Sequence, residues 1–427
     1  MLLPFLKDRE AAGETIRVGV IGCGQMGEGL TAQMELMHAM EASVVADIVP
    51  GLAAKALLAA GVDKSSIVET DDPDVAAAAL DADKRVATTN ASIATTTAAI
   101  DIACEVTGIT EVGARVVLEA IEAGKHVMQM NVETDATVGY LLRKLAKDAG
   151  VVYTLTGGDE PGATVLLHDF ATSLGFDVVA AGKGKNNPLD RAANPDTCAA
   201  RAKRQQMNPK MLASFVDGTK TMAEMTTLAN AIGFVPDVRG MRGPEVTPQN
   251  MAEVYIPTEF GGIESRPGVV DFGIGIAPGV FVVFTTDHPK LARDLDYLLL
   301  GPGPFWSLYR PYHLTSLETP FWMARAVIFG ETTAATDNPP TAETITIAKK
   351  DLRTGEVIDD FGGFSAYGLI EKADIASAEN LLPMGLAPGA VLKRDIPLGQ
   401  PLTYDDVELD EESTIVKLRR RQDAELA

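Results

Sequence analysis

Apolar runs and helix-forming stretches alternate along the first third of the chain. The strand-like runs cover residues 17–21, 43–48, 67–70, 102–107, 125–130 and 151–155, and Ala-rich segments lie between them. Alternation of this kind is typical of repeated βαβ units, which build a doubly wound parallel sheet. We therefore predict an α/β fold whose first domain, residues 1–155, is a Rossmann sheet preceded by a leading arm over 1–13.

The pattern becomes mixed beyond residue 155. A helical block spans 209–232, and strand-like pieces occur at 268–273 and 280–285. We predict an α/β domain over 156–340 that binds substrate and mediates dimerisation. After it, the stretch 386–407 has turn signals every few residues between short apolar pieces, which is typical of a compact β-rich module. We assign that module to 341–427 and expect its last residues, 415–427, to form a solvated end.

The first apolar run leads directly into a glycine-rich turn and a helical stretch. The turn reads Gly22-x-Gly24-x-x-Gly27. In this context the first glycine permits a tight turn, the second lets the backbone approach a pyrophosphate, and the third lets helix and strand pack closely. Asp47 ends the next apolar run, where a carboxylate is expected to hold the ribose hydroxyls. The sequence therefore predicts a nicotinamide-cofactor site.

Residues that follow the other predicted strands are further cofactor candidates, because ligands lie at the carboxyl ends of the strands in such sheets. Together with two residues of the glycine loop, these candidates are Gln25, Met26, Thr88, Asn90, Thr107, Gly108 and Asn131. For Thr88 and Asn90, capping of the next helix explains the residue types equally well.

Composition narrows the class of protein. Hydrophobic residues make up 46% of the 427 residues and charged residues 22%, an ordinary balance for a globular protein, and the formal net charge is −22. That charge argues against nucleic-acid binding, which needs a broad basic surface. The chain shows neither an apolar run of membrane-spanning length nor a secretory segment. Its three cysteines lie far apart, so we expect reduced thiols and a cytoplasmic protein.

One segment runs against the acidic balance. Between Lys183 and Lys220 there are eight basic and three acidic residues, which points to an anionic ligand such as a phosphorylated sugar. Arg201 and Arg204 also fit a solvated helix face. Lys183 and Lys185 fit that alternative poorly, because they alternate with glycine after an apolar strand and would share one face. We expect further substrate contacts from Asn186, Lys203, Lys210, Arg239 and Arg242.

Carboxylates near this segment are candidates for catalysis. Asp159 and Glu160 lie in a Gly-rich turn, where they could bind a divalent cation such as Mg²⁺ or Mn²⁺, act as acid and base, or cap the following helix. Lys220 and Glu224 have helical spacing. A surface ion pair is the plain explanation, although Lys220 could donate the proton that carbonyl reduction needs.

Motifs in both halves of the chain carry a resemblance. The segments 22–27, 101–108 and 122–127 resemble homoserine-dehydrogenase-like oxidoreductases, and 392–407 resembles the SAF domain of sialic acid synthases, which implies a SAF-like C-terminal module. Homoserine dehydrogenases have Thr-Ala-Asn-Lys where this chain reads Gln129-Met-Asn-Val132. The absent lysine speaks against homoserine as substrate.

A closer resemblance spans nearly the whole chain. Residues 158–162, 182–188 and 207–220 are similar to the 1-deoxy-D-xylulose 5-phosphate reductoisomerase-like proteins of Brucella-type bacteria. This implies a homodimeric enzyme that uses NADPH and a divalent cation to form 2-C-methyl-D-erythritol 4-phosphate, the first committed step of the methylerythritol phosphate isoprenoid pathway. Asp47 disfavours a 2′-phosphate, so NADH stays possible. The alternatives are a dehydrogenase of another sugar-derived carbonyl or homoserine-like substrate, and a catalytically inactive nucleotide sensor.

Overall fold

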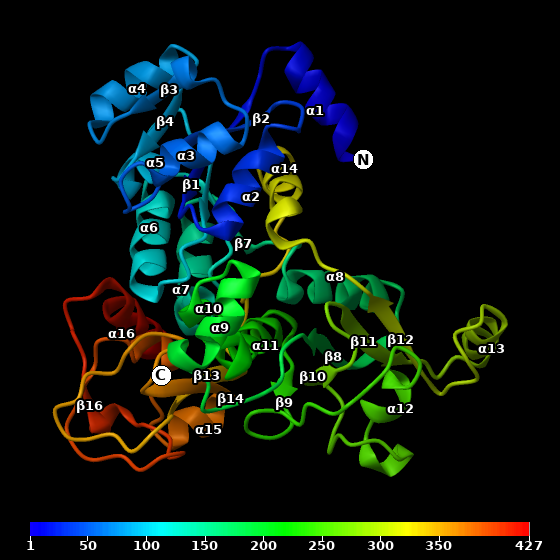
Figure 1. Ribbon diagram of the computed structural model, residues 1–427. Coiled ribbons are helices and arrows are strands. Elements are labelled where there is room, and N and C mark those ends of the chain that lie inside the picture. The colour runs from blue at the N-terminus through cyan, green and yellow to red at the C-terminus, as the bar shows by residue number, and fades with distance from the viewer. Residues whose placement is uncertain (427) are drawn as a thin grey trace. The chain divides into compact units, whose positions relative to one another are not determined.

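A computed structural model describes residues 1–426 and divides into two compact units (Figure 1). The first unit comprises Met1–Asp159 and Leu314–Asp337, and the second comprises Glu160–His313 and the chain from Asn338 onward. The predicted three-domain division stays a prediction. Across the described residues, no helix is long and apolar enough to cross a membrane.

The first unit is built on a seven-stranded sheet with the order β3-β4-β2-β1-β5-β6-β7. Its strands are β1 (Ile16–Ile21), β2 (Met40–Ala46), β3 (Ile67–Glu69), β4 (Arg85–Thr88), β5 (Ile102–Glu105), β6 (His126–Gln129) and β7 (Tyr153–Leu155). Every pairing is parallel. The order reverses at β1, which has β2 on one side and β5 on the other. The predicted doubly wound Rossmann sheet is confirmed.

Helices cover this sheet and complete its core. They are α1 (Leu2–Ala11), α2 (Gln25–Met34), α3 (Leu52–Ala59), α4 (Pro73–Asp81), α5 (Ala91–Thr96), α6 (Thr110–Glu122), α7 (Val132–Asp148) and α14 (Thr319–Phe329), with 3-10 turns at Lys64–Ser66 and Thr315–Leu317. The predicted leading arm is mostly the helix α1. This helix packs onto the sheet, because Leu2 and Leu6 are buried in the same core as Val18. Met323 of α14 belongs to this core too, so residues far apart in sequence close it.

The second unit contains a five-stranded mixed sheet with the order β12-β11-β8-β10-β9. Its strands are β8 (Asp177–Lys185), β9 (Val235–Pro236), β10 (Val269–Ile274), β11 (Val280–Thr285) and β12 (Phe305–Arg310). Its helices are α8 (Glu160–Ser173), α9 (Pro195–Gln205), α10 (Pro209–Val216), α11 (Thr219–Ile232), α12 (Met251–Val254) and α13 (Pro289–Tyr297), with a 3-10 turn at Thr258–Phe260. Ala181 of β8 shares one core with α8 and α11 residues such as Ala171 and Met225, so these two helices cover one face.

The helical block predicted over 209–232 is two helices, α10 and α11. Asp217 ends α10, and Gly218 has a φ of +86° that a residue with a side chain rarely adopts. The chain therefore turns between the two helices. Side chains from three other segments, Lys185, Arg191 and Lys349, meet at this corner.

The chain after β12 and α14 adds small β-sheets, as predicted. β13 (Ala342–Ala348) pairs with β14 (Ala366–Lys372), and β15 (Val391–Leu392) pairs with β16 (Val407–Glu408), both antiparallel. Alongside them lie α15 (Ala373–Ala378) and 3-10 turns at Met384–Leu386 and Tyr404–Asp406. The expected solvated end is wrong, because 414–426 forms the helix α16 (Thr414–Leu426), which buries Ile415 and Leu418.

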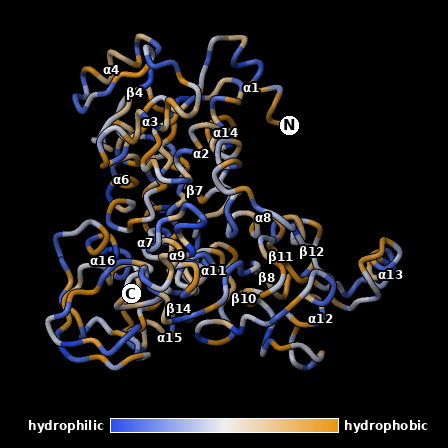
Figure 2. Tube along the Cα trace, in the orientation of Figure 1, coloured by the Kyte–Doolittle hydropathy of each residue, from blue (hydrophilic) through white to orange (hydrophobic). Residues whose placement is uncertain are grey.

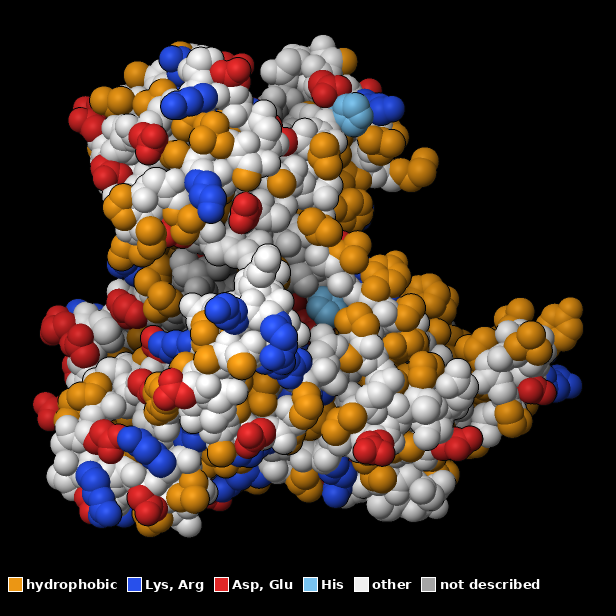
Figure 3. Space-filling view, in the orientation of Figure 1, with side chains coloured by type: hydrophobic (Ala, Val, Ile, Leu, Met, Phe, Trp, Pro, Cys, Tyr) orange, Lys and Arg blue, Asp and Glu red, His pale blue; other side chains and the backbone are white. Residues whose placement is uncertain are grey.

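Hydrophobic residues also gather outside the cores. Four consecutive side chains, Tyr297 to Leu300, are exposed at the end of α13, with Leu299 92% exposed. Figure 2 and Figure 3 show this apolar end of α13. The stretch that follows, 301–313, forms β12 and the segment leading to His313.

Candidate functional site

The glycine loop of the first unit joins β1 to the N-terminus of α2. Gly24 is the N-cap of α2 and has no side chain to cover the first backbone N–H groups. A Cβ atom at Gly27 would lie 1.9 Å from the carbonyl oxygen of Gly22, so only glycine allows this approach of helix and strand. Gln25 and Met26 form the exposed first turn of α2. The helix N-terminus is thus open to an anionic group such as a pyrophosphate.

The loops after β1 and β5 lie side by side where the strand order reverses. A Cβ atom at Gly22 would lie 3.2 Å from the backbone nitrogen of Thr107. Glu105 shapes the second loop, because its Oε1 accepts hydrogen bonds from the Thr107 hydroxyl and from the Thr107 backbone N–H at 2.7 Å. Gly108 follows with a φ of +71°. Thr107 and Gly108 therefore stand at the switch point where doubly wound sheets bind ligands.

Asp47 is held against the glycine loop. Its Oδ2 accepts a hydrogen bond from the Cys23 backbone N–H at 2.8 Å, and its Oδ1 accepts one from Val49 at 2.9 Å. Burial and then Asp47 raise the pKa of the Cys23 thiol to about 12, which suits a small packing residue rather than a reactive one.

A cavity of about 360 Å³ opens beside the carboxyl ends of β3 and β4. Its lining includes Glu69, Asp71 and Thr88. Among the lining residues that the structure describes there is no lysine or arginine. This part of the sheet edge is therefore acidic.

Three predicted cofactor contacts have structural roles. Asn90 is the N-cap of α5 and Asn131 is the N-cap of α7, and each side chain accepts a backbone N–H at 3.1 Å. The Thr88 hydroxyl donates to Asp71 Oδ1 at 2.7 Å. Capping thus accounts for Asn90, while the cofactor roles of all three stay predictions.

A buried cluster of charged side chains forms around Lys183 in the second unit. Lys183 lies on β8, and its Nζ donates to Glu160 Oε1 of α8 at 2.7 Å and to Glu224 Oε2 of α11. His313 Nε2 lies 3.4 Å from the same Glu160 oxygen. The residues Lys183, Glu160 and Glu224 are 3–7% exposed. The expectation that Lys220 and Glu224 form an ion pair at the surface is wrong about the surface, because Glu224 is buried and pairs with Lys183.

The charges of this cluster stabilise one another. Burial by itself lowers the pKa of Lys183, but Glu160 and Glu224 outweigh burial and hold it above the ordinary value. Burial, and next the charge of Glu160, raises the pKa of Glu224. Lys183 is therefore a fixed ammonium, and Glu224 is a carboxyl group of the cluster whose pKa lies above its ordinary value.

Lys185 has a different environment from Lys183, although both side chains are buried on β8. Its Nζ donates to the Phe215 carbonyl oxygen near the end of α10 at 2.6 Å. Burial, with contributions from Lys183 and Arg191, lowers the pKa of Lys185 to about 8. Lys185 thus exchanges its proton close to neutral pH, as a general acid or base must.

The remaining candidates for substrate contacts pair with other residues or are exposed. Lys210 pairs with Asp360 at 2.6 Å, Arg239 pairs with Glu371 and Glu379, and Arg242 pairs with Asp237. Asn186 and Lys203 are exposed. Lys220 is half-buried and acts on Glu224 by lowering its pKa. The structure therefore brings together Lys183, Lys185 and Glu160, with Lys220 nearby, and leaves the other substrate contacts as predictions.

The two carboxylates predicted to bind a divalent cation, Asp159 and Glu160, are consecutive residues at the boundary between the two units. Asp159 is the last residue of the first unit and Glu160 the first of the second, so a shared divalent cation stays a prediction. His313 also belongs to the cluster, although the sequence does not predict it. Its Nδ1 donates to the Pro278 carbonyl oxygen at 2.7 Å, which turns Nε2 toward Glu160. No local motif surrounds His313, and only the fold brings it to Glu160.

Comparisons with known proteins add one family match. Residues 158–319 match the family model of the catalytic domain of oxidoreductase DRL. That segment is less than half of the chain and contains the whole Lys183 cluster, including Lys185 and His313. A search of curated proteins finds no match.

Similar solved structures are dehydrogenases of low identity. A scyllo-inositol dehydrogenase from Lactobacillus casei is 10% identical, with 75% of this chain and 90% of that chain covered and a TM-score of 0.43. Its complex with NAD(H) and scyllo-inositol is 11% identical, with coverage of 76% and 92% and a TM-score of 0.41. A UDP-N-acetylglucosamine 3-dehydrogenase from Acidithiobacillus ferrooxidans is 14% identical, with coverage of 64% and 65% and a TM-score of 0.32. Likeness at this level says nothing about the substrate of this chain.

These findings correct the family expected from the sequence motifs. The matching family model describes the catalytic domain of oxidoreductase DRL, not a 1-deoxy-D-xylulose 5-phosphate reductoisomerase. The identification as a 1-deoxy-D-xylulose 5-phosphate reductoisomerase of the isoprenoid pathway is therefore wrong. Short lysine- and glycine-rich motifs led to it, and such motifs are shared by proteins with different reactions.

Proposed function

We propose that this protein is a nicotinamide-dependent dehydrogenase that interconverts a hydroxyl group and a carbonyl group on a small sugar-derived substrate. The observation that carries the proposal is the lysine pair on β8. Lys183 is a fixed ammonium between two carboxylates, whereas Lys185 donates to a backbone carbonyl oxygen, and burial lowers its pKa to about 8. Both lie in the segment that matches an oxidoreductase catalytic domain. The glycine loop of the first unit supplies the complementary cofactor site.

The chemistry assigns a separate role to each lysine. In the oxidation direction, neutral Lys185 accepts the proton of the substrate hydroxyl group. The carbon that bears this hydroxyl group loses a hydride. Lys183 stabilises the negative charge that develops on the oxygen. Glu160 and Glu224 accept hydrogen bonds from neighbouring hydroxyl groups, which favours a polyhydroxylated substrate. When bound, the nicotinamide ring supplies the hydride acceptor or donor.

The first unit favours NAD(H) over NADP(H). Asp47 stands at the end of β2, held toward the glycine loop through Cys23, and the neighbouring cavity carries Glu69 and Asp71. A 2′-phosphate would meet these carboxylates with no described lysine or arginine in the cavity lining to neutralise it. NADPH, which the sequence motifs suggested, is therefore our second choice.

The test is a turnover screen with the full chain. NAD⁺ and NADP⁺ are each combined with inositols, sugars, sugar alcohols and sugar phosphates, with and without EDTA, and reduction of the cofactor is followed by absorbance. We expect reduction of NAD⁺ by at least one polyhydroxylated compound. Absence of cofactor binding would refute the proposal. Tight binding without turnover of any compound would instead favour a nucleotide sensor.

We also propose a homodimer. The exposed apolar residues from Tyr297 to Leu300 give one surface that a second copy could cover. Light scattering of the wild type and of Leu299→Asp is the test. A monomeric wild type would refute the proposal. A dimer that Leu299→Asp does not weaken would show that the dimer interface lies on another surface.

A further inference from the structure

We propose that Lys349 is a positioning residue of the lysine site: it fastens the C-terminal segment to the corner between α10 and α11 and thereby fixes the helix end that holds Lys185. The inference rests on the proposed function, because it takes Lys185 to be the residue that exchanges the proton. It also gives the C-terminal segment a role in catalysis without contact with substrate.

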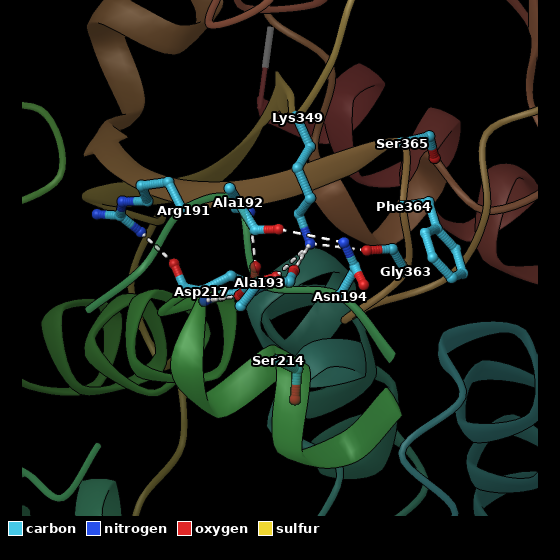
Figure 4. Close-up of polar contacts among 12 residues, drawn as sticks. Arg191, Ala192, Ala193, Asn194, Ser214, Asp217, Lys349, Gly363, Phe364 and Ser365 are labelled. Carbon is cyan, nitrogen blue, oxygen red and sulfur yellow. Dashed lines mark hydrogen bonds and ion pairs between the residues drawn. The ribbon is translucent and has the colours of Figure 1, made fainter. Parts of the chain in front are cut away.

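Lys349 follows β13 directly and uses all three ammonium protons (Figure 4). Its Nζ donates to Asp217 Oδ2 at 2.7 Å and to the carbonyl oxygens of Ala193 and Gly363 at 2.8 Å each. The side chains of Lys349 and Asp217 are 3% and 0% exposed. A buried ammonium thus joins three segments that are far apart in the sequence.

The corner at Asp217 is the point to which Lys185 is tied. Lys185 donates to the Phe215 carbonyl oxygen in the last turn of α10, and Arg191 donates to the Asp217 carbonyl oxygen at 2.7 Å. The end of a helix attracts cations because its last carbonyl groups lack partners within the helix. Asp217 Oδ1 accepts the Thr219 backbone N–H at 2.8 Å, which fixes the start of α11.

The loop 359–365 lies directly on α10. A Cβ atom at Gly362 would lie 2.1 Å from the carbonyl oxygen of Lys210, so the two backbones touch. Lys210 also pairs with Asp360 at 2.6 Å. Within the loop, Asp359 accepts the Ser365 backbone N–H at 3.0 Å. The Lys349 bond to Gly363 therefore holds a preformed loop against the helix that supports Lys185.

The electrostatic consequence has a definite sign. The charged groups that act on Lys185 are Lys183, Glu224, Arg191 and Asp217. Tyr367 acts in turn on Arg191, whose guanidinium lies 5.2 Å from the tyrosine ring centre. Burial raises the pKa of Asp217, and Lys349 lowers it. At the alkaline pH at which Lys185 titrates, removal of Lys349 leaves Asp217 as a buried anion near Lys185. An anion favours the ammonium form and raises the pKa of Lys185.

The experiment measures the protonation of Lys185 without turnover. The full chain receives brief pulses of acetic anhydride at a series of pH values, and mass spectrometry follows acetylation of Lys185, whose rate depends on the fraction of free amine. Lys349→Met should raise the pKa of Lys185 by about 1, and Lys349→Arg should restore it. Lys350→Met is the matched control, because Lys350 is exposed and pairs with Glu356 at the surface.

A second variant keeps the test decisive if Lys349→Met folds poorly. The double variant Lys349→Met with Asp217→Asn removes both buried charges, and the pKa of Lys185 should then not exceed the wild-type value. An unchanged pKa in Lys349→Met, or equal pKa values in the single and double variants, would overturn the proposal. Because acetylation needs no substrate, these outcomes are independent of whether the dehydrogenase assignment holds.

Discussion

The Nζ atom of Lys183 lies 2.7 Å from Oε1 of Glu160, across the packing of β8 against α8. Glu224 on α11 holds the same ammonium from another helix. This arrangement keeps Lys183 charged and buried. Lys185, two residues later on the same strand, donates to a backbone carbonyl oxygen and lies near the positive charge of Lys183. The two lysines are therefore chemically different.

Replacing Lys183 tests the cluster itself. Lys183→Met leaves Glu160 and Glu224 buried without their cation, so we expect a loss of about 3 kcal/mol in the free energy of unfolding and loss of turnover. Urea denaturation and the turnover assay measure these effects. The control is Lys290→Met, because Lys290 is 60% exposed and its pair with Asp294 is at the surface. A stability loss no larger than that of the control would contradict the account of the cluster.

Asp47 tests the cofactor preference. In Asp47→Asn the amide oxygen still accepts the Cys23 N–H, but the negative charge is gone. The ratio of the NADPH to the NADH dissociation constant should fall by at least about tenfold, as measured by fluorescence titration. Asp148→Asn, at an exposed position at the end of α7, is the control. If Asp47→Asn leaves the ratio unchanged, Asp47 does not decide between the cofactors.

Two buried carboxyl groups predict a pH dependence of stability in the first unit. Burial raises the pKa of Glu105 and of Asp135 to about 7, from ordinary values of 4.5 and 3.8. The folded state therefore binds more protons than the unfolded state between about pH 4 and pH 7, and stability falls as the pH rises through this range.

The amide variants Glu105→Gln and Asp135→Asn preserve the oxygens that accept from Thr107 and Tyr153. We expect each to be more stable than the wild type at pH 8, by on the order of 2 kcal/mol, and to show no such gain at pH 4. Urea denaturation at both pH values is the measurement, and Glu122→Gln at an exposed position is the control. Equal effects at both pH values would show that ionisation is not responsible.

The terminal helix α16 gives a prediction about stability. Arg419 is buried and pairs with Glu343 of β13 at 2.5 Å, whereas Arg421 is about half exposed and pairs with Glu425 on its own helix. Arg419→Ala should lower the free energy of unfolding by about 3 kcal/mol because it leaves Glu343 buried and unpaired. Arg421→Ala should change it by less than about 0.5 kcal/mol. Similar effects of the two substitutions in urea denaturation would contradict the assignment of α16 as a packed helix.

Much of the fold is predictable because local pattern determines it. The strands β1, β2, β5, β6 and β7 follow from apolar runs, since strands buried on both faces need such runs. The edge strand β3 is only half-buried and follows from the apolar pair Ile67 and Val68. β4 is absent from the predicted runs because Val86 is the one β-branched apolar residue in Arg85–Thr88. The basic residues near the end of the chain favour a solvated segment when the sequence is taken alone. Arg419 is buried because it pairs with Glu343, which is distant in the sequence.

The site was predictable only in part. The alternation of strand side chains placed Lys183 and Lys185 on one face, as the structure shows. Their partners come from other elements: Glu224 lies 41 positions after Lys183, and Phe215 lies 30 after Lys185. Helical spacing suggested Lys220 as the partner of Glu224, but packing of α11 against the sheet turns Glu224 inward. His313 and Lys349 have no local signal at all.

The most direct measurement of the central claim compares the turnover number of the wild type and of Lys185→Met over a pH series, with the best substrate from the screen. We predict a wild-type profile with a limb near pH 8 and a loss of at least about 100-fold in the variant, while NADH binding is unchanged. A Lys185→Met enzyme that turns over within threefold of the wild type, with the same pH profile, would contradict the claim that this lysine transfers the proton.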